Sequence, residues 1–123
     1  MKRIFVVLMG LIVFSCVSPY RQVREMPIRN VDLSGIPNGV YHGAFTYGSG
    51  KGFTYRVQTH VVNYRIHGID VVANRDSKYA RKAAGVLMRI VELQTPNVDA
   101  VSGATTTSKA FMKAVENSLR DAG

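Results

Sequence analysis

The chain has little of the residue types on which disulfide-bonded proteins and metalloproteins depend. Cys16 is the only cysteine, which excludes an internal disulfide, a cysteine-ligated cluster and a haem-attachment C-x-x-C-H motif. The spacing of His42, His60 and His67 does not suggest a metal site, so we expect these side chains to face solvent or to be satisfied by neighbours. We also find no pair of residues with the character of a catalytic dyad. The sequence therefore predicts no metal ion and no catalytic residues.

Acidic residues are scarce as well. Asp and Glu number 8 against 16 Lys and Arg, and the net charge is +8. A net positive charge of this size can attract nucleic acid. However, helix-turn-helix, zinc-finger and RNA-binding aromatic signatures are all missing, so we expect no nucleic-acid partner. Arg21, Arg24 and Arg29 come soon after Cys16, where they would lie near anionic headgroups if that cysteine carried a lipid.

The apolar run over residues 4–14 is too short to span a bilayer as a helix. It follows two basic residues and has the layout of a secretory signal. Val13-Phe14-Ser15-Cys16 looks like a lipobox, although phenylalanine is unusual at its place. We therefore expect a lipoprotein signal peptide over residues 1–15, lipid on Cys16 and an exported protein. Its anchor would be the outer face of the cytoplasmic membrane or a periplasmic or outer membrane. The alternative is an ordinary cleaved signal that leaves Cys16 as an unpaired thiol.

Residues 16–36 show no sustained period, and we expect a lipid-anchored tether with one short ordered piece at Val31–Leu33. Strand signals follow, because β-branched and aromatic residues alternate with polar ones. The glycine cluster over residues 48–52 lacks the spacing of a phosphate loop and is interpreted as a hairpin turn. Asn63-Tyr64 is expected to form a tight turn. Together these signals predict an antiparallel meander of three strands, over residues 39–47, 53–62 and 66–73.

A long helix is predicted next, capped by Asp76 or Ser77 and reaching about Leu93. Gly85 in its middle suggests close packing against the sheet. The predicted apolar stripe consists of Tyr79, Ala83, Val86, Leu87 and Ile90. The basic residues on or beside the other face are interpreted as a solvated surface rather than a ligand site: Lys78, Arg81, Lys82 and Arg89.

A second helix is predicted at the C-terminus, with Phe111, Ala114, Val115 and Leu119 on one face. Four successive hydroxyl residues, Thr105 to Ser108, lie at its start, and Thr107 or Ser108 could serve as its N-cap. These hydroxyls meet the free amides and the positive end of the helix dipole. The segment is therefore either an ordinary hydroxyl-rich helix cap or an anion site with nucleophilic hydroxyls.

The string Asp99-x-x-Ser102-Gly103-Ala104-Thr105 resembles the flavinylation motif D-x-x-[ST]-G-A-T of the FMN-binding domain family. That family includes subunits of sodium-pumping and ferredoxin-linked membrane oxidoreductases. Gly39-Val40-Tyr41-His42-Gly43 also matches the G-x-Y-x-G strand that opens such domains, so the resemblance covers about residues 36–122. Relatives usually place glycine in the second hairpin, where this chain has Tyr64.

The resemblance implies covalent FMN. In the family, a magnesium-dependent flavin transferase cleaves FAD and joins the FMN phosphate to the last threonine of the motif, which is Thr105 here. Asp99 would belong to the recognition sequence, and Tyr79 and Tyr41 are our candidates for stacking on the flavin. The other cofactor-binding residues would be the phosphate turn and the hydroxyls that follow it: Ser102, Gly103, Ala104, Thr106, Thr107 and Ser108.

We accordingly expect an α+β domain over residues 37–123, with a small antiparallel sheet, one long packed helix and a C-terminal helix after the S-G-A-T turn. Val98 to Ser102 would be an extended entry to the motif or an extra strand. The expected function is electron transfer with a membrane redox partner. One alternative is a reductase with non-covalent FMN, although no G-x-G-x-x-G nicotinamide site is present. The other is a cofactor-free lipoprotein interaction module.

Overall fold

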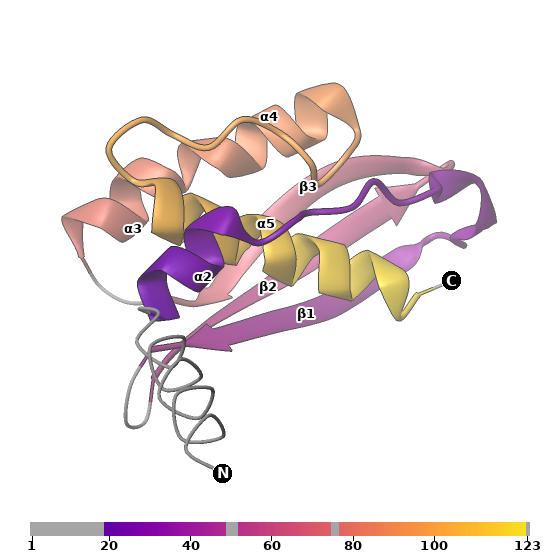
Figure 1. Ribbon diagram of the computed structural model, residues 1–123. Coiled ribbons are helices and arrows are strands. Elements are labelled where there is room, and N and C mark those ends of the chain that lie inside the picture. Colours follow the sequence, from indigo (N-terminus) through magenta and orange to yellow (C-terminus); the bar gives the residue numbers. More distant parts are fainter. Residues whose placement is uncertain (1–18, 49–51, 75–76, 123) are drawn as a thin grey trace, which may run out of the picture.

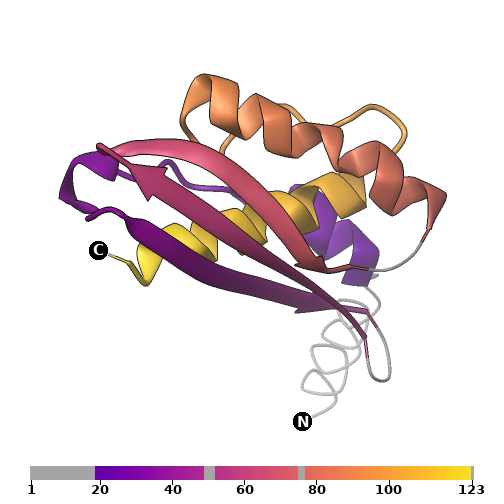
Figure 2. The same cartoon turned by 180° about the vertical axis from the view of Figure 1, so that it is seen from behind.

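The computed structural model describes residues 19–48, 52–74 and 77–122, and it confirms the predicted α+β class. Three expectations fall outside the described residues: the signal peptide, the lipid on Cys16 and the alternative cap at Asp76. The elements in order are α2 (Pro19–Glu25), the 3-10 turn η2 (Leu33–Gly35), β1 (Gly39–Tyr47), β2 (Phe53–Val62), β3 (Arg65–Ala73), α3 (Lys78–Ala83), α4 (Gly85–Leu93) and α5 (Thr105–Arg120). All described helices gather on one face of the sheet (Figure 1 and Figure 2).

The sheet is the antiparallel meander that the sequence predicts, with strand order β1-β2-β3. The tight turn at Asn63-Tyr64 is also confirmed. Their φ angles are 52° and 61°, and two left-handed residues in succession are typical of a two-residue type I′ hairpin turn. Tyr64 thus adopts a conformation that glycine takes at less cost.

The hydrophobic core forms where α5 crosses the inner face of the sheet. The predicted inner face of β2 is buried at Tyr55, Val57, Thr59 and Val61. The predicted face of α5 is buried at Phe111, Ala114, Val115 and Leu119. The ring of Phe111 meets that of Tyr55 edge-on, with centroids 5.1 Å apart and planes at 74°. Such aromatic contacts stabilise a core beyond the area that they bury.

Gly43 allows α5 to approach β1 closely. A Cβ on Gly43 would lie 2.1 Å from the carbonyl oxygen of Ala114 and 2.6 Å from the amide nitrogen of Ser118. Beside this contact, the hydroxyls of Thr59 and Ser118 are hydrogen-bonded at 2.8 Å. Backbone-to-backbone packing therefore fixes α5 on the sheet, and with it the position of the first turn of α5.

The predicted long helix is in fact two short helices, α3 and α4, separated at Ala84. The cap at Ser77 is confirmed, because its Oγ accepts a hydrogen bond from the amide of Ala80 at 3.1 Å. Most of the predicted stripe is buried, but Tyr79 is 51% exposed and Ala80 takes the buried place instead. The error lies within α3, because the buried positions Ala80, Ala83, Leu87 and Ile90 keep one helical spacing across Ala84 and Tyr79 lies beside that stripe.

Two further expectations about this region are wrong or resolved. Gly85 does not pack on the sheet; it is exposed, and a Cβ there would come no closer than 3.9 Å to Val101. The segment Val98–Ser102 is an extended loop that enters the motif, and it adds no strand to the described sheet. At the end of α4, the side chain of Gln94 bonds to both the amide and the carbonyl of Ile66, at 2.7 and 2.9 Å, and so attaches α4 to β3.

Residues 19–36 are more ordered than the tether that the sequence suggests. They form α2 and η2, and Val23, Ile28 and Ile36 are buried. The short ordered piece expected at Val31–Leu33 is displaced to Leu33–Gly35. Within the described ranges, no helix combines the length and apolarity needed to cross a bilayer.

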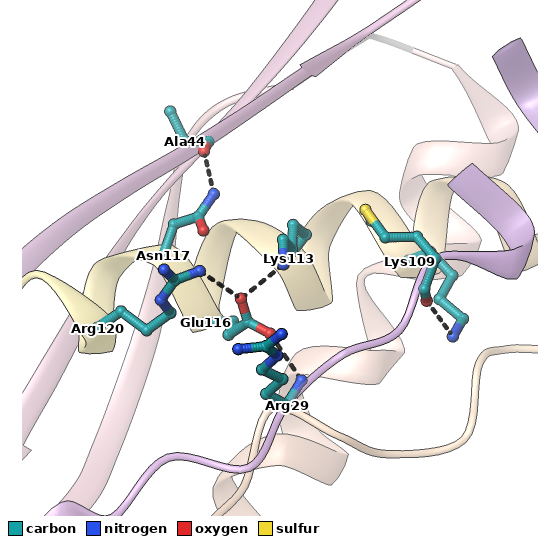
Figure 3. A network of polar contacts seen from close by, with 8 residues as sticks. Arg29, Ala44, Lys109, Lys113, Glu116, Asn117 and Arg120 are labelled. Atoms are coloured by element: carbon teal, nitrogen blue, oxygen red, sulfur yellow. Dashed lines mark hydrogen bonds and ion pairs between the residues drawn. The ribbon is translucent and has the colours of Figure 1, made fainter. Parts of the chain in front are cut away.

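A buried carboxylate attaches this N-terminal segment to α5. Glu116 is fully buried and accepts hydrogen bonds from the amide of Arg29 at 2.6 Å and from Nζ of Lys113 at 2.7 Å (Figure 3). Burial alone would raise the pKa of Glu116, but the hydrogen bonds from Lys113 and Arg29 outweigh it and hold the pKa below its usual value. Nearer the start of α5, Lys109 donates to the carbonyl of Met26 at 3.0 Å.

Candidate functional site

A tight turn leads directly into α5. Gly103 has φ of 82°, a left-handed conformation that glycine adopts without strain. The amide of Ala104 donates to the carbonyl of Val101 at 3.0 Å, which closes the turn. A left-handed third residue is typical of a type II turn. Ser102 and Gly103 are exposed at its tip, so this backbone is accessible to a ligand.

The helix that follows begins earlier than predicted and has no side-chain cap. Its N-cap is Ala104, with no side-chain hydrogen bond to the first turn, so the predicted caps Thr107 and Ser108 are wrong. The first helical hydrogen bond runs from the amide of Ser108 to the carbonyl of Ala104 at 2.9 Å. The amides of Thr105 to Thr107 therefore precede the helical ladder, and the first turn contains no acidic residue. An uncapped N-terminus with this charge balance suits an anion.

The four hydroxyl residues of α5 lie in different surroundings. Thr105 is exposed, Thr106 is half-buried, and Thr107 is 7% exposed. Ser108 is fully buried, and its Oγ accepts a hydrogen bond from the amide of Val101 at 3.0 Å. Ser108 therefore holds the turn onto the helix, whereas Thr105 is exposed to solvent.

A hollow of about 290 Å³ opens beside these hydroxyls. Its walls bring residues from β1, α3 and α5 together: Tyr47, Tyr79, Gly103, Ala104, Thr105, Thr106 and Thr107. Tyr79, one of the two tyrosines selected from the sequence, lines this hollow. Tyr41 does not; its hydroxyl donates to the carbonyl of Pro37 at 2.6 Å, and the residue lies towards the start of β1. The other aromatic wall is Tyr47, which stacks on Tyr55 with centroids 5.7 Å apart and planes at 8°.

Two basic residues interpreted from the sequence as a solvated surface contact the motif. The Nζ of Lys82 lies 2.7 Å from the position that a Cβ would occupy on Gly103, so an ammonium group stands over the turn. Arg89 donates to the carbonyls of Asp99 and Ala100, at 2.8 and 3.2 Å, and orders the entry to the motif. The carboxylate of Asp99 is exposed outside the hollow. Lys82 is thus a functional candidate that the sequence interpretation missed, and Tyr47 is an aromatic wall that it did not prefer over Tyr41.

A larger hollow, of about 370 Å³, lies at the other half of α5 and is a weaker candidate for binding an anion. Its walls include Asn117 and Asp121 near the C-terminal end of the helix. That end carries the negative pole of the helix dipole, and the negative charge of Asp121 offsets the positive charge of Arg56 in the same walls. A phosphate-bearing ligand therefore fits the N-terminal hollow better.

The described ranges hold no group of three or more potential metal-ligating side chains. Of the three histidines, His60 is hydrogen-bonded to the carboxylate of Asp70 at 2.8 Å on the open face of the sheet. His42 and His67 are exposed, as the sequence suggested.

The model of a family described as the FMN-binding domain matches residues 50–120, which is more than half of the chain. The match spans β2 to α5 and includes every residue from Asp99 to Ser108. It starts after β1, so the opening strand Gly39–Gly43 lies outside it. No curated protein matches the chain.

Proposed function

This chain belongs to the FMN-binding domain family, and from that premise we propose that it is an electron-transfer protein whose FMN is esterified through its phosphate to Thr105. The observation that carries this proposal is the setting of Thr105. It is exposed in the first turn of an uncapped helix and lines a hollow with two aromatic walls. Free helix amides, a left-handed glycine and an ammonium group meet at the same place.

These donors match a phosphate diester. The amides of Thr105 to Thr107 would donate hydrogen bonds to its oxygens, and Lys82 would balance its charge. The small Gly103 leaves the space that a Cβ would otherwise fill. In the attachment reaction, Oγ of Thr105 forms a bond to the FMN phosphorus of FAD and the pyrophosphate bond breaks. AMP leaves with the electron pair, and the hydroxyl proton passes to the magnesium-dependent flavin transferase.

The aromatic walls serve the ring of the cofactor. Tyr47 is held by its stacking on Tyr55, whereas Tyr79 is exposed on α3 and can adjust to a ligand. Bound FMN supplies the ability to accept and pass on one or two electrons. The protein needs only to hold and shield the ring, and this role requires no catalytic residue.

We further propose that the signal peptide over residues 1–15 is removed and that Cys16 carries lipid. An exported protein cannot rely on a pool of free flavin, and a covalent bond prevents loss of the cofactor by diffusion. A lipid on Cys16 would keep the protein beside a membrane oxidoreductase that exchanges electrons with it. The proposed partners are thus the flavin transferase, this redox protein and the bilayer.

The direct test is the intact mass of the protein after incubation with FAD, magnesium and a competent flavin transferase. We expect a mass increase of one FMN less one water, in a yellow protein that keeps its colour through acid precipitation. Thr105→Val should abolish the increase, whereas Thr46→Val, the same change at an exposed position on β1, should not. A flavin adduct that survives Thr105→Val would refute the assignment. Flavin released by acid would favour non-covalent binding, and a colourless protein would favour a cofactor-free module.

A further inference from the structure

The hollow beside Thr105, called the flavin hollow below, lies at the same end of the molecule as the start of the described chain. In both views, α2, α3 and the first turn of α5 lie at the end opposite the C-terminus (Figure 1 and Figure 2). From this arrangement we infer that the protein lies on an anionic bilayer with its flavin hollow facing the lipid headgroups. The inference deepens the proposed function and rests on the proposed lipid at Cys16.

The helix α2 is fixed beside the hollow. Tyr47 is a wall of the Thr105 hollow and also of a second hollow of about 340 Å³, whose other walls include Gln22, Val23 and Met26. Lys109 of α5 donates to the carbonyl of Met26 at 3.0 Å, and Val23 is buried. Because α2 is packed in place, its start has a defined position relative to Thr105.

The chain between Cys16 and α2 is short. Cys16 precedes the first residue of α2, Pro19, by three residues. Three fully extended residues span at most about 10 Å. A lipid on Cys16 would therefore bring the start of α2 close to the bilayer surface, and the hollow beside α2 with it. A tether over residues 16–36, as the sequence suggested, would have imposed no such orientation.

The helices beside the hollow carry an excess of positive charge. The helices α2 and α3 carry five basic side chains against the single carboxylate of Glu25, which pairs with Arg21 at 3.1 Å. All five are exposed: Arg21, Arg24, Lys78, Arg81 and Lys82. Juxtamembrane clusters of this kind bind anionic lipids, and the attraction is limited to about a Debye length from the surface. Lys82 lies over Gly103 at the hollow, and the helices that carry the other four cations lie at the same end of the molecule. Their attraction to lipid would therefore turn the hollow towards the membrane. The electron partner of the flavin would then lie at headgroup depth.

The experiment measures the orientation of the full lipidated chain on vesicles. A fluorophore is attached to Lys78→Cys on α3 or to Asp121→Cys after α5, and is quenched by lipids with spin-labelled headgroups. The intact mass of each sample reports whether Cys16 carries lipid. We expect greater quenching at position 78 than at position 121 on vesicles containing phosphatidylglycerol. The same difference should be found with and without flavin, so that the readout is independent of the redox activity.

A charge reversal tests the cause. Arg24→Glu should reduce the quenching at position 78 on phosphatidylglycerol vesicles. Arg65→Glu, at the β2–β3 turn, should not, because antiparallel β2 carries that turn to the end remote from Tyr47. Equal quenching at both positions in a lipidated chain would overturn the inference and leave the flavin assignment intact. So would quenching that is no larger on anionic than on phosphatidylcholine vesicles, which would point to a protein partner. A chain without lipid on Cys16 would overturn the anchoring and this inference together.

Discussion

The ammonium nitrogen of Lys82 lies 2.7 Å from the point where a Cβ would stand on Gly103. This relationship joins α3 to the turn before Thr105, although the two residues are 21 positions apart in the sequence. Glycine keeps the turn open, and lysine supplies positive charge to the space that results. Each half of the relationship leads to a prediction.

Gly103→Ala should impair both the turn and flavin attachment. Alanine in a left-handed conformation costs about 1–2 kcal/mol, and its methyl group would displace Lys82. We expect a lower free energy of unfolding in urea and a lower flavin content after incubation with the transferase. The control is Gly35→Ala, where a Cβ meets nothing within 4 Å, and both quantities should stay near wild type. Full flavin loading of Gly103→Ala would contradict the role that we assign to the Gly103 turn.

Lys82→Met should slow flavin attachment without unfolding the protein. The side chain is exposed, so its contact with a phosphate is worth about 1 kcal/mol, or roughly a fivefold change in rate. Arg65→Met is the control, because it removes an exposed positive charge at the β2–β3 turn, away from the hollow. The measurement is the initial rate of flavin incorporation at low salt. Equal rates for the two variants would show that Lys82 acts only as part of a general surface charge.

Ser108→Ala should destabilise the turn that precedes α5. The buried Oγ of Ser108 accepts the hydrogen bond of the half-buried Val101 amide, and its loss should lower the free energy of unfolding by about 1 kcal/mol. We expect faster hydrogen exchange at Val101 together with the lower stability. Ser34→Ala, at an exposed position in η2, should leave exchange at Val101 unchanged. Unaltered exchange at Val101 in Ser108→Ala would rule out the role that we assign to this hydroxyl.

The sheet and the flavin motif could be predicted from the sequence because each leaves a local signal. The inner face of β2 follows a period of two, Asn63-Tyr64 marks the turn, and the residues that lead to Thr105 are contiguous. Lys82 could not be placed in the same way, because its contact with Gly103 depends on how α3 packs against the turn before α5, 21 positions further along the chain. The predicted stripe also places Tyr79 in the core, where Ala80 takes the buried position.

The order in the N-terminal segment was missed for a related reason. The helix α2 has seven residues and buries Val23 against α5, which is too little apolar sequence to show a period. What orders the segment further along is the bond between Arg29 and Glu116, two residues 87 positions apart. Sequence patterns report neighbours along the chain, so a buried carboxylate that binds a distant amide gives no signal in them.

That carboxylate predicts a pH-dependent stability. The pKa of Glu116 lies below the usual 4.5, because its hydrogen bonds outweigh the effect of burial. As the pH falls, the unfolded chain therefore takes up this proton before the native protein does. The contribution of Glu116 is complete above the unfolded-state pKa and is lost as the pH falls through the native-state pKa.

Glu116→Gln should accordingly lower the free energy of unfolding at pH 7 by about 2 kcal/mol, the cost of weakening a charge-assisted, buried hydrogen bond. The deficit relative to wild type should shrink below about pH 4.5, because the wild-type carboxylate then becomes protonated as well. Urea unfolding at a series of pH values measures both quantities. Glu92→Gln, an exposed change on α4, should differ from wild type by no more than about 0.5 kcal/mol at any pH. A deficit of Glu116→Gln that stays constant from neutral to acid pH would mean that the charge of Glu116 does not hold the N-terminal segment to α5.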